Sequence, residues 1–301
     1  MVRSRLTACL DYVQVIVPVV LDAINFVAVE HHEFRSYGAW SYALQDYTDM
    51  NLTMRFDDPN MILLQQAEDP YFYRDRLTMP KLVVNAGMDE FQQPDDTHYW
   101  WNDMPEPKHF VILPNAEHSL ATGILEAVPT IGAFALAHLK KDVVPTFTWT
   151  IDEQTGEIVA TVDNNGIVHS ATAWWAYSCG QNAWDNNVNR KDWRVAHLDN
   201  PCSCGLYAEG YCANLKALWH KQELESETVK GKRVYRVKVD PPGDGRYVAF
   251  FIDFKFVNKN AVPIDIMGMY NKMKHPLAEN NKLVRFTDKF GADPVRSLVL
   301  I

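Results

Sequence analysis

The stretch KLVVNAGMDEFQQPDD, residues 81–96, decides the fold, because an apolar run of strand length ends there at a turn that presents Asp89. A second stretch, FVILPNAEHS at 110–119, repeats this pattern and presents His118. Short runs rich in β-branched residues, without polar alternation, are typical of parallel strands covered on both faces. Functional side chains collect just beyond the carboxyl ends of such strands. The sequence therefore predicts that Asp89 and His118 lie side by side at one edge of a parallel sheet.

The same pattern extends on both sides of these stretches. VQVIVPVV (13–20) is predicted as a further buried strand, and LATGILEAVPTIGAFALAHLKK (120–141) is predicted as a helix. Alternation of strands and helices favours an open parallel sheet. We therefore predict an α/β fold for residues 1–145, with strands of a doubly wound parallel sheet.

The pattern changes near residue 145. TFTWTIDEQTGEIVATVDNN (146–165) predicts two strands around a Gln-Thr-Gly turn. Further on, ATAWWAYS, KRVYRVKVD and RYVAFFIDFKFV alternate apolar and polar residues and are separated by turns such as PPGDG. Residues 146–301 are therefore predicted to form an antiparallel, β-sandwich-like domain.

Composition narrows the classes of partner. The chain has 301 residues, a formal net charge of −9 and a sequence pI of about 5.6. Its densest basic cluster, KGKR (230–233), is too small for a phosphate-binding surface, so nucleic acid is not an expected partner. The longest apolar stretch (12–29) is interrupted by a proline and an aspartate, which argues against a membrane span. No cofactor is expected.

The cysteines point to an oxidising environment. Cys9 stands alone, whereas the other four fall close together, and their C-S-C-x7-C spacing lacks the C-x2-C pairs of a zinc site. Two disulfides are predicted within this group, with four free thiols as the alternative: Cys179, Cys202, Cys204 and Cys212. Asn51 begins an N-L-T sequon, a possible glycosylation site. The first residues contain no clear signal peptide.

Asp89 and His118 have the chemistry of an acid and a base in a catalytic triad. An aspartate can accept a hydrogen bond from the imidazole, fix its tautomer and stabilise the imidazolium ion. Glu90 is the alternative acid, one residue further along. The simpler interpretation is that Asp89 caps a helix and His118 is an ordinary loop residue, but the order of the two favours a triad.

The nucleophile of such a triad is missing from its expected place. In α/β-hydrolases the serine precedes the acid and sits in a G-x-S-x-G turn. Only Ser4, Ser36 and Ser41 precede Asp89, and none is in that motif. Ser178, in AYSCG, follows His118 and falls in the β region.

Three blocks give the chain a family resemblance: RSYGAWSYALQDY (35–47), DPYFYRDRLTMPKLVVNAGMDEFQQPD (69–95) and PEPKHFVILPNAEHSL (105–120). They resemble the PhoPQ-activated pathogenicity-related proteins, a family that includes a slime-mould autocrine proliferation repressor. The resemblance continues more loosely through ATAWWAYS, RKDWRV and GRYVAFFIDFKF. It implies an α/β-hydrolase-like region followed by a β-sandwich-like region, an extracellular location, and Asp89 and His118 as acid and base.

The same resemblance implies where the serine lies. The family's serine turn precedes a helix that ends in a sequence like LTACLD (6–11) of this chain. We therefore expect the nucleophile and the first strands of the sheet upstream of Met1. Without those strands, residues 13–20 would form an unpaired edge.

Smaller signals have plainer interpretations. His31-His32-Glu33 looks like a metal motif, but adjacent helical histidines point about 100° apart, so a solvated or interface position is expected. Asp95 and Asp96 are expected to cap the helix that follows them. Trp40, Tyr42 and Tyr47 could line a substrate groove or pack in the core.

The sequence thus supports two functions. The first is serine-type hydrolysis of a small ester, amide or peptide substrate, with the chain inactive because it has no nucleophile. The alternative is a secreted, non-catalytic signalling or binding protein that acts on a protein receptor.

Overall fold

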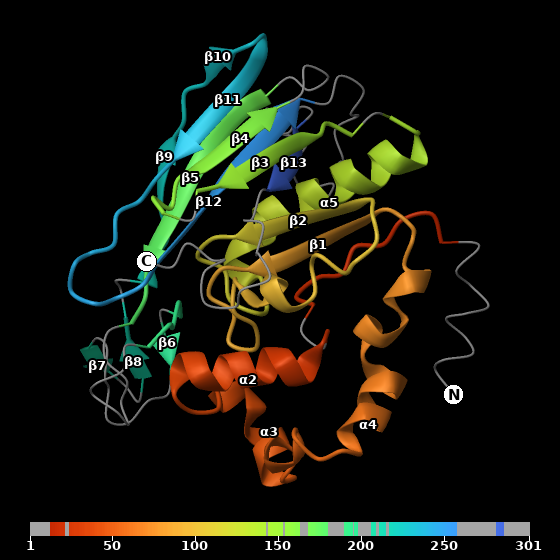
Figure 1. The fold of residues 1–301 in the computed structure, drawn as a ribbon, viewed down its shortest axis with the longest axis vertical. Coiled ribbons are helices and arrows are strands. Elements are labelled where there is room, and N and C mark those ends of the chain that lie inside the picture. Colours follow the sequence, from red (N-terminus) through yellow and green to blue (C-terminus); the bar gives the residue numbers. More distant parts are fainter. Residues whose placement is uncertain are drawn as a thin grey trace, which may run out of the picture.

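The protein is described by a computed structural model, which places residues 13–21, 24–142, 144–152, 154–162, 168–179, 190–194, 196–197, 206–208, 211–214, 217–257 and 281–285. Helices combine with parallel and antiparallel strands, which confirms the predicted α/β character. Figure 1 shows helices α2 (Phe26–Tyr37), α3 (Gln45–Asp49) and α4 (Met61–Glu68) at one end of the molecule. The large antiparallel strands lie at the other end, and two parallel strands with α5 (Ile124–Leu139) lie between.

The two decisive stretches form the predicted parallel pair. β1 (Lys81–Ala86) pairs with β2 (Lys108–Leu113), and Ala86 lies opposite Leu113 at their carboxyl ends. Every residue of β1 is buried, as expected for a strand covered on both faces. Helix α5 covers one face, where its apolar side chains pack with those of both strands: Leu82, Val84, Val111, Leu113, Ala127 and Phe134.

Residues 13–20 lie along the outer side of β1. Ile16 and Val19 make parallel bridges to Lys81 and Val84, but Pro18 has no N–H to donate and the pairing stays irregular. Val20 N donates to Val84 O at 2.8 Å. Among the placed residues, the backbone of this segment forms hydrogen bonds with β1 and with Pro80, which precedes β1. The side of the segment that faces away from β1 is a partly exposed edge of the sheet.

This edge leads to a prediction about solubility. Unpaired edges that are apolar promote association, and a lysine on the edge suppresses it. We expect the purified chain to associate in solution and Val19→Lys to shift it toward the monomer, as measured by light scattering after size exclusion. Leu63→Lys, on the exposed side of α4, is the control and should change nothing. A monodisperse, cooperatively melting wild-type monomer would contradict the prediction.

The antiparallel region contains the strands predicted after residue 145. They form a four-stranded sheet in the order β10-β11-β4-β3 and most of a six-stranded sheet in the order β1-β2-β13-β12-β5-β9. The bounds are β3 Phe147–Ile151, β4 Ile158–Val162, β5 Val168–Tyr177, β9 His220–Glu223, β10 Glu227–Val229, β11 Lys232–Val237, β12 Val248–Val257 and β13 Asn281–Arg285. Apolar side chains of both sheets share one core, in which Phe254 and Phe256 are fully buried.

The six-stranded sheet runs through both predicted regions. β13 pairs with β12 over five residue pairs and joins β2 at Arg285, opposite Phe110. The predicted boundary near residue 145 marks a change in the sequence pattern. The hydrogen-bonded sheet nevertheless contains strands from both sides of that boundary.

Short elements complete the fold. In the part of the chain that the structure describes, 3-10 turns connect the larger elements: η2 Tyr42–Leu44, η3 Thr53–Arg55, η4 Pro70–Arg76, η5 Asp96–Tyr99 and η6 Ala121–Gly123. A small sheet in the order β6-β8-β7 contains β6 Ala196–His197, β7 Leu206–Ala208 and β8 Tyr211–Ala213.

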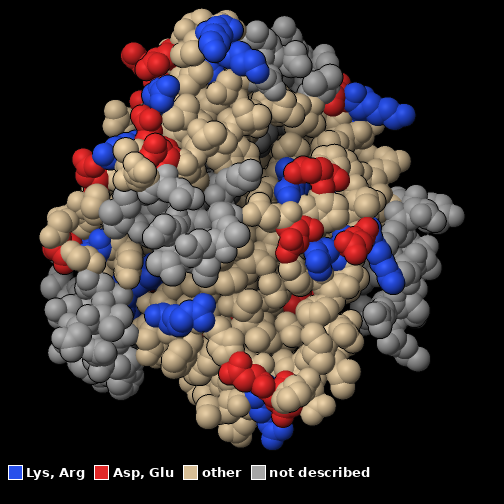
Figure 2. Space-filling view, viewed as in Figure 1, with Lys and Arg blue, Asp and Glu red and all other residues tan. Residues whose placement is uncertain are grey.

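Helix α5 and the turn before it, Ala121–Leu139, are long and apolar enough to cross a membrane by length and composition alone. In the fold, α5 contributes Ala127 and Phe134 to the core that it forms with β1 and β2, and 33% of the most apolar window of Ala121–Leu139 is buried. Acidic and basic residues are interspersed on the face of the molecule in Figure 2.

Candidate functional site

The loops that follow β1 and β2 lie side by side because the strands are parallel and adjacent. Gly87 N donates to Leu113 O and Met88 N donates to Ala116 O, both at 2.9 Å. These bonds extend the pairing past the strand ends and bring together the two turns that carry the predicted acid and base.

Asp89 and His118 meet in this position. His118 Nδ1 lies 3.0 Å from Asp89 Oδ1 and 3.1 Å from Oδ2. A carboxylate only accepts hydrogen bonds, so Nδ1 is the donor and the neutral imidazole has a lone pair on Nε2. The Asp89 side chain is fully buried, whereas the His118 side chain is 24% exposed. The pair therefore combines a buried carboxylate with a partly exposed imidazole, as the predicted roles of acid and base require.

The Asp89 carboxylate also organises its own loop. Its Oδ1 accepts from Phe91 N at 2.8 Å and from Gln92 N at 3.1 Å. The Phe91 ring lies against the His118 imidazole, with ring centroids 4.4 Å apart and planes tilted by 49°. One turn thus holds the acid and also covers one side of the base.

Glu90, the alternative acid, occupies a different position. Its Oε2 accepts from the backbone N of His118 at 3.1 Å, and its carbonyl accepts from Ser41 Oγ at 2.7 Å. Glu90 therefore binds the backbone of the base, while Asp89 binds its imidazole. The geometry favours Asp89 as the acid.

The serines considered as nucleophiles serve the backbone. Ser41 is buried and its Oγ donates to Glu90 O, while Ser178 Oγ donates to Cys179 O and accepts from Tyr247 N, each at 3.0 Å. Ser36 is buried within α2. Ser4 and Cys9 lie outside the described residues.

Trp219, which the sequence did not single out, binds both loops of the site. Its Nε1 donates to Gly87 O at 3.1 Å, and its backbone N and O bind the Asn115 amide at 2.7 and 3.1 Å. A Cβ at position 87 would lie 2.9 Å from Trp219 Nε1, so this position requires glycine. Gly87, directly after β1, is the feature of the sequence that indicates a close approach of another residue to the backbone. The sequence does not indicate which residue that is.

A buried ionic cluster (His32, Asp95, Asp96 and Lys191) anchors the far end of the acid loop. His32 Nδ1 donates to Asp96 Oδ1 at 2.7 Å, and Lys191 Nζ binds both Asp95 and, at 2.5 Å, His32 Nε2. Burial opposes ionisation of Asp95, but Lys191 and His32 outweigh it and hold the pKa of Asp95 well below its usual range.

Two predictions about these residues were wrong. Asp95 and Asp96 make no side-chain cap to η5, because their carboxylates bind the ionic cluster instead. His32 is buried rather than solvated, whereas its neighbour His31 pairs with Asp57 near the surface, at 2.9 Å.

A second buried network joins α2 to residues 190–194. Arg194 binds the Asp192 carboxylate through Nε and Nη2, at 3.0 and 2.8 Å, and its Nη1 donates to Ser41 Oγ at 3.3 Å. Glu33 accepts from Ser41 N at 2.9 Å, and burial raises the pKa of Glu33 well above its usual range. Through Ser41 and Glu90, this network reaches the backbone of His118.

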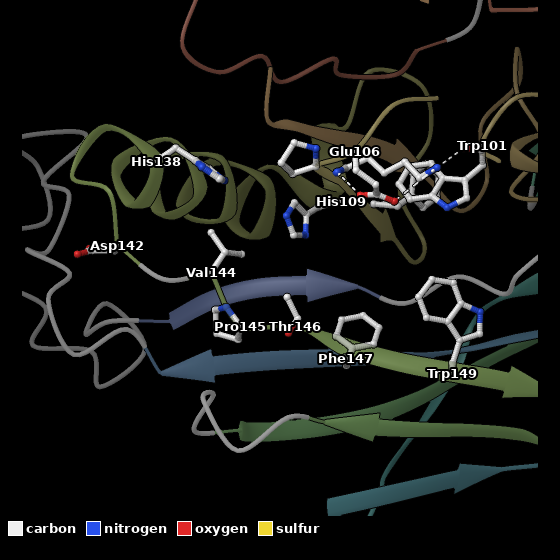
Figure 3. Close-up of a pocket in the computed structure, with 13 residues that line it drawn as sticks. Trp101, Glu106, His109, His138, Asp142, Val144, Pro145, Thr146, Phe147 and Trp149 are labelled. Atoms are coloured by element: carbon white, nitrogen blue, oxygen red, sulfur yellow. Dashed lines mark hydrogen bonds and ion pairs between the residues drawn. The ribbon is translucent and has the colours of Figure 1, made fainter. Parts of the chain in front are cut away.

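Figure 3 shows a separate cavity of about 420 Å³ at the opposite ends of the strands. His109 and His138 approach it from β2 and α5, and Pro145 and Phe147 line its other side. The cavity lies at the start of β2, whereas His118 follows its end. The two ends of β2 are roughly 16 Å apart at about 3.3 Å per residue, so the cavity is distinct from the site of His118.

The remaining predicted sites are described only in part. Cys179 is disulfide-bonded, whereas Cys202 and Cys204 lie outside the described residues and the pairing stays a prediction. Cys212 is part of β8. Asn51, the sequon asparagine, is exposed and has a positive φ of 57°. No group of three or more metal-binding side chains occurs among the residues that the structure places.

Comparison with known proteins places the chain in a family. Residues 5–184 match the family described as PhoPQ-activated pathogenicity-related protein. Autocrine proliferation repressor protein A of Dictyostelium discoideum is 31% identical over 255 residues, which cover 82% of this chain and 48% of the relative. The chain therefore spans about half the length of this curated relative, and no solved structure gives a significant match. Because the family match covers more than half of the chain, the protein belongs to the PhoPQ-activated pathogenicity-related family.

Proposed function

We propose that this chain carries the acid and the base of a serine-type ester or amide hydrolase. Asp89 orients His118, and His118 acts first as general base and then as general acid in acyl transfer to water. The observation that carries the proposal is the 3.0 Å contact between His118 Nδ1 and a buried carboxylate, beyond the ends of two adjacent parallel strands. The region up to residue 145 then belongs to an α/β-hydrolase-like domain, followed by a β-sandwich-like one.

No serine of the sequence lies in a G-x-S-x-G turn, the motif that carries the nucleophile in α/β-hydrolases. Ser41 and Ser178 use their hydroxyls to bind the backbone, and neither lies in a G-x-S-x-G turn. We therefore propose that this chain, tested on its own, does not hydrolyse esters or amides.

Two measurements on the purified chain test the proposal. Long-range ¹H–¹⁵N NMR should find neutral His118 with its proton on Nδ1, and Asp89→Asn should disturb that tautomer while the control Glu90→Gln preserves it. A fluorophosphonate probe should leave the chain unlabelled. A wild-type proton on Nε2 would refute the dyad, and labelling that disappears in His118→Ala would refute the missing nucleophile.

A secreted, non-catalytic signalling protein is the second candidate. It is favoured by the name of the Dictyostelium relative and by the disulfide at Cys179, since disulfides persist in oxidising compartments. Its partner would be a protein receptor rather than a small ester or amide. Sequencing the transcript upstream of Met1 separates the candidates: a G-x-S-x-[RG] turn favours the hydrolase, and a replaced serine favours the signal.

A further inference from the structure

A cavity of about 390 Å³ lies among the helices at the end of the molecule that carries α2, α3 and α4. This volume falls within the range of small-molecule sites. Most of its lining is apolar, including three phenylalanines and Tyr47, which the sequence suggested for a substrate groove.

One residue of the cavity lining, Phe91, is in contact with both members of the candidate catalytic pair. The Phe91 ring lines the cavity and also packs on the His118 imidazole, at 4.4 Å between ring centroids. Its backbone N donates to Asp89 Oδ1 at 2.8 Å, so its position is fixed by the acid. A ligand in contact with Phe91 inside the cavity therefore lies about one aromatic ring away from the base.

The charges of the lining select the ligand. Among the described residues, Glu30, Glu68 and Asp69 supply its carboxylates, and no Lys, Arg or His lines it. Asp69 is committed to the start of α2, where it accepts from Asn25 N at 2.9 Å and from Phe26 N at 3.0 Å, but it still adds negative potential. Aromatic rings together with carboxylates favour a cation, and they disfavour an anion.

We propose that this cavity is the specificity pocket of the site and takes an apolar group that bears a positive charge, such as an alkylammonium. The identification of this group as part of a substrate rests on the proposed hydrolase function, whereas the binding itself does not. The substrate class is then an ester or amide whose apolar part is cationic.

Calorimetric titration of the purified chain with three eight-carbon ligands tests the charge selection. Octyltrimethylammonium should bind at least tenfold more tightly than octanoate, with octanol between them. Glu68→Gln, at an exposed position of the lining, should reduce this preference without weakening octanol binding. Equal affinities for the ammonium and the carboxylate would overturn the proposal.

A matched pair of tryptophan variants on α4 tests the location. Leu64 lines the cavity and is 42% exposed, so Leu64→Trp should fill the cavity and weaken ammonium binding at least tenfold. Leu63, its neighbour, is 63% exposed and is not part of the lining, so Leu63→Trp should bind like the wild type. Unchanged binding in Leu64→Trp would overturn the location.

The NMR signals of His118 connect the cavity to the site. They should shift when octyltrimethylammonium binds to the wild type and should stay unchanged in Leu64→Trp. If octyltrimethylammonium binds as expected but His118 does not carry its proton on Nδ1, the proposed hydrolase function is refuted and the proposed binding pocket is not. A correct tautomer with no ligand binding would refute the pocket and leave the hydrolase intact.

Discussion

Replacing Asp192 by asparagine is expected to lower the free energy of unfolding by about 3–5 kcal/mol, the usual cost of removing one partner from a buried ion pair. The Asp192 side chain is fully buried between Arg190 and Arg194, whose guanidinium groups lie 2.7 and 2.8 Å from Oδ2. Its Oδ1 also accepts from Arg194 N at 3.0 Å. An amide would remove the negative charge that faces both of these buried guanidinium groups.

Urea denaturation followed by tryptophan fluorescence measures this loss. Asp244 provides a matched control, because it pairs with Arg246 at the same spacing in sequence, at 2.8 Å, but its side chain is 50% exposed. Exposed ion pairs contribute at most about 1 kcal/mol, so Asp244→Asn should have little effect. If both variants lost the same free energy of unfolding, the burial of Asp192 would not determine its contribution to stability.

The second large effect concerns catalysis. In a protein that joins this chain to a serine turn, Asp89→Asn is expected to lower kcat for ester hydrolysis by about 10⁴-fold, as loss of the orienting carboxylate does in serine proteases. The asparagine side chain can present its N–H₂ to Nδ1 and so favour the tautomer that cannot accept the serine proton. Steady-state kinetics with a chromogenic ester measures the change.

Glu90→Gln is the control for that experiment. The Glu90 carboxylate accepts from the backbone N of His118, and a glutamine oxygen can accept the same bond, so kcat should fall by less than tenfold. If Glu90→Gln lowered kcat as much as Asp89→Asn does, Glu90 rather than Asp89 would be the catalytic acid.

The parallel pair and the position of its loops could be predicted because the information is local. Residues 81–86 and 108–113 are largely apolar runs of strand length, and chain geometry places the loops after them at the same sheet edge. Once these two strands pair in parallel, Asp89 and His118 lie in neighbouring loops. The loops were predictable as a consequence of the strands.

The supports of the site were not predictable, because they come from distant parts of the chain. Trp219 binds Gly87 across 132 positions, and Lys191 binds Asp95 across 96. Asp95 follows a proline and precedes a helical turn, so local rules make it a cap. The tertiary contact with Lys191 overrides that preference, and no periodicity in the sequence indicates it.

Residues 190–194 also affect the order in which the chain can fold. Arg194 reaches Ser41 across 153 positions and Lys191 reaches His32 across 159. Contacts so far apart in sequence form slowly, because a long loop must close before they are made. During synthesis, the bonds from Lys191 to His32 and from Arg194 to Ser41 therefore form only after residues 191–194 have emerged, whereas the bond of Ser41 to Glu33, eight positions away, can form early.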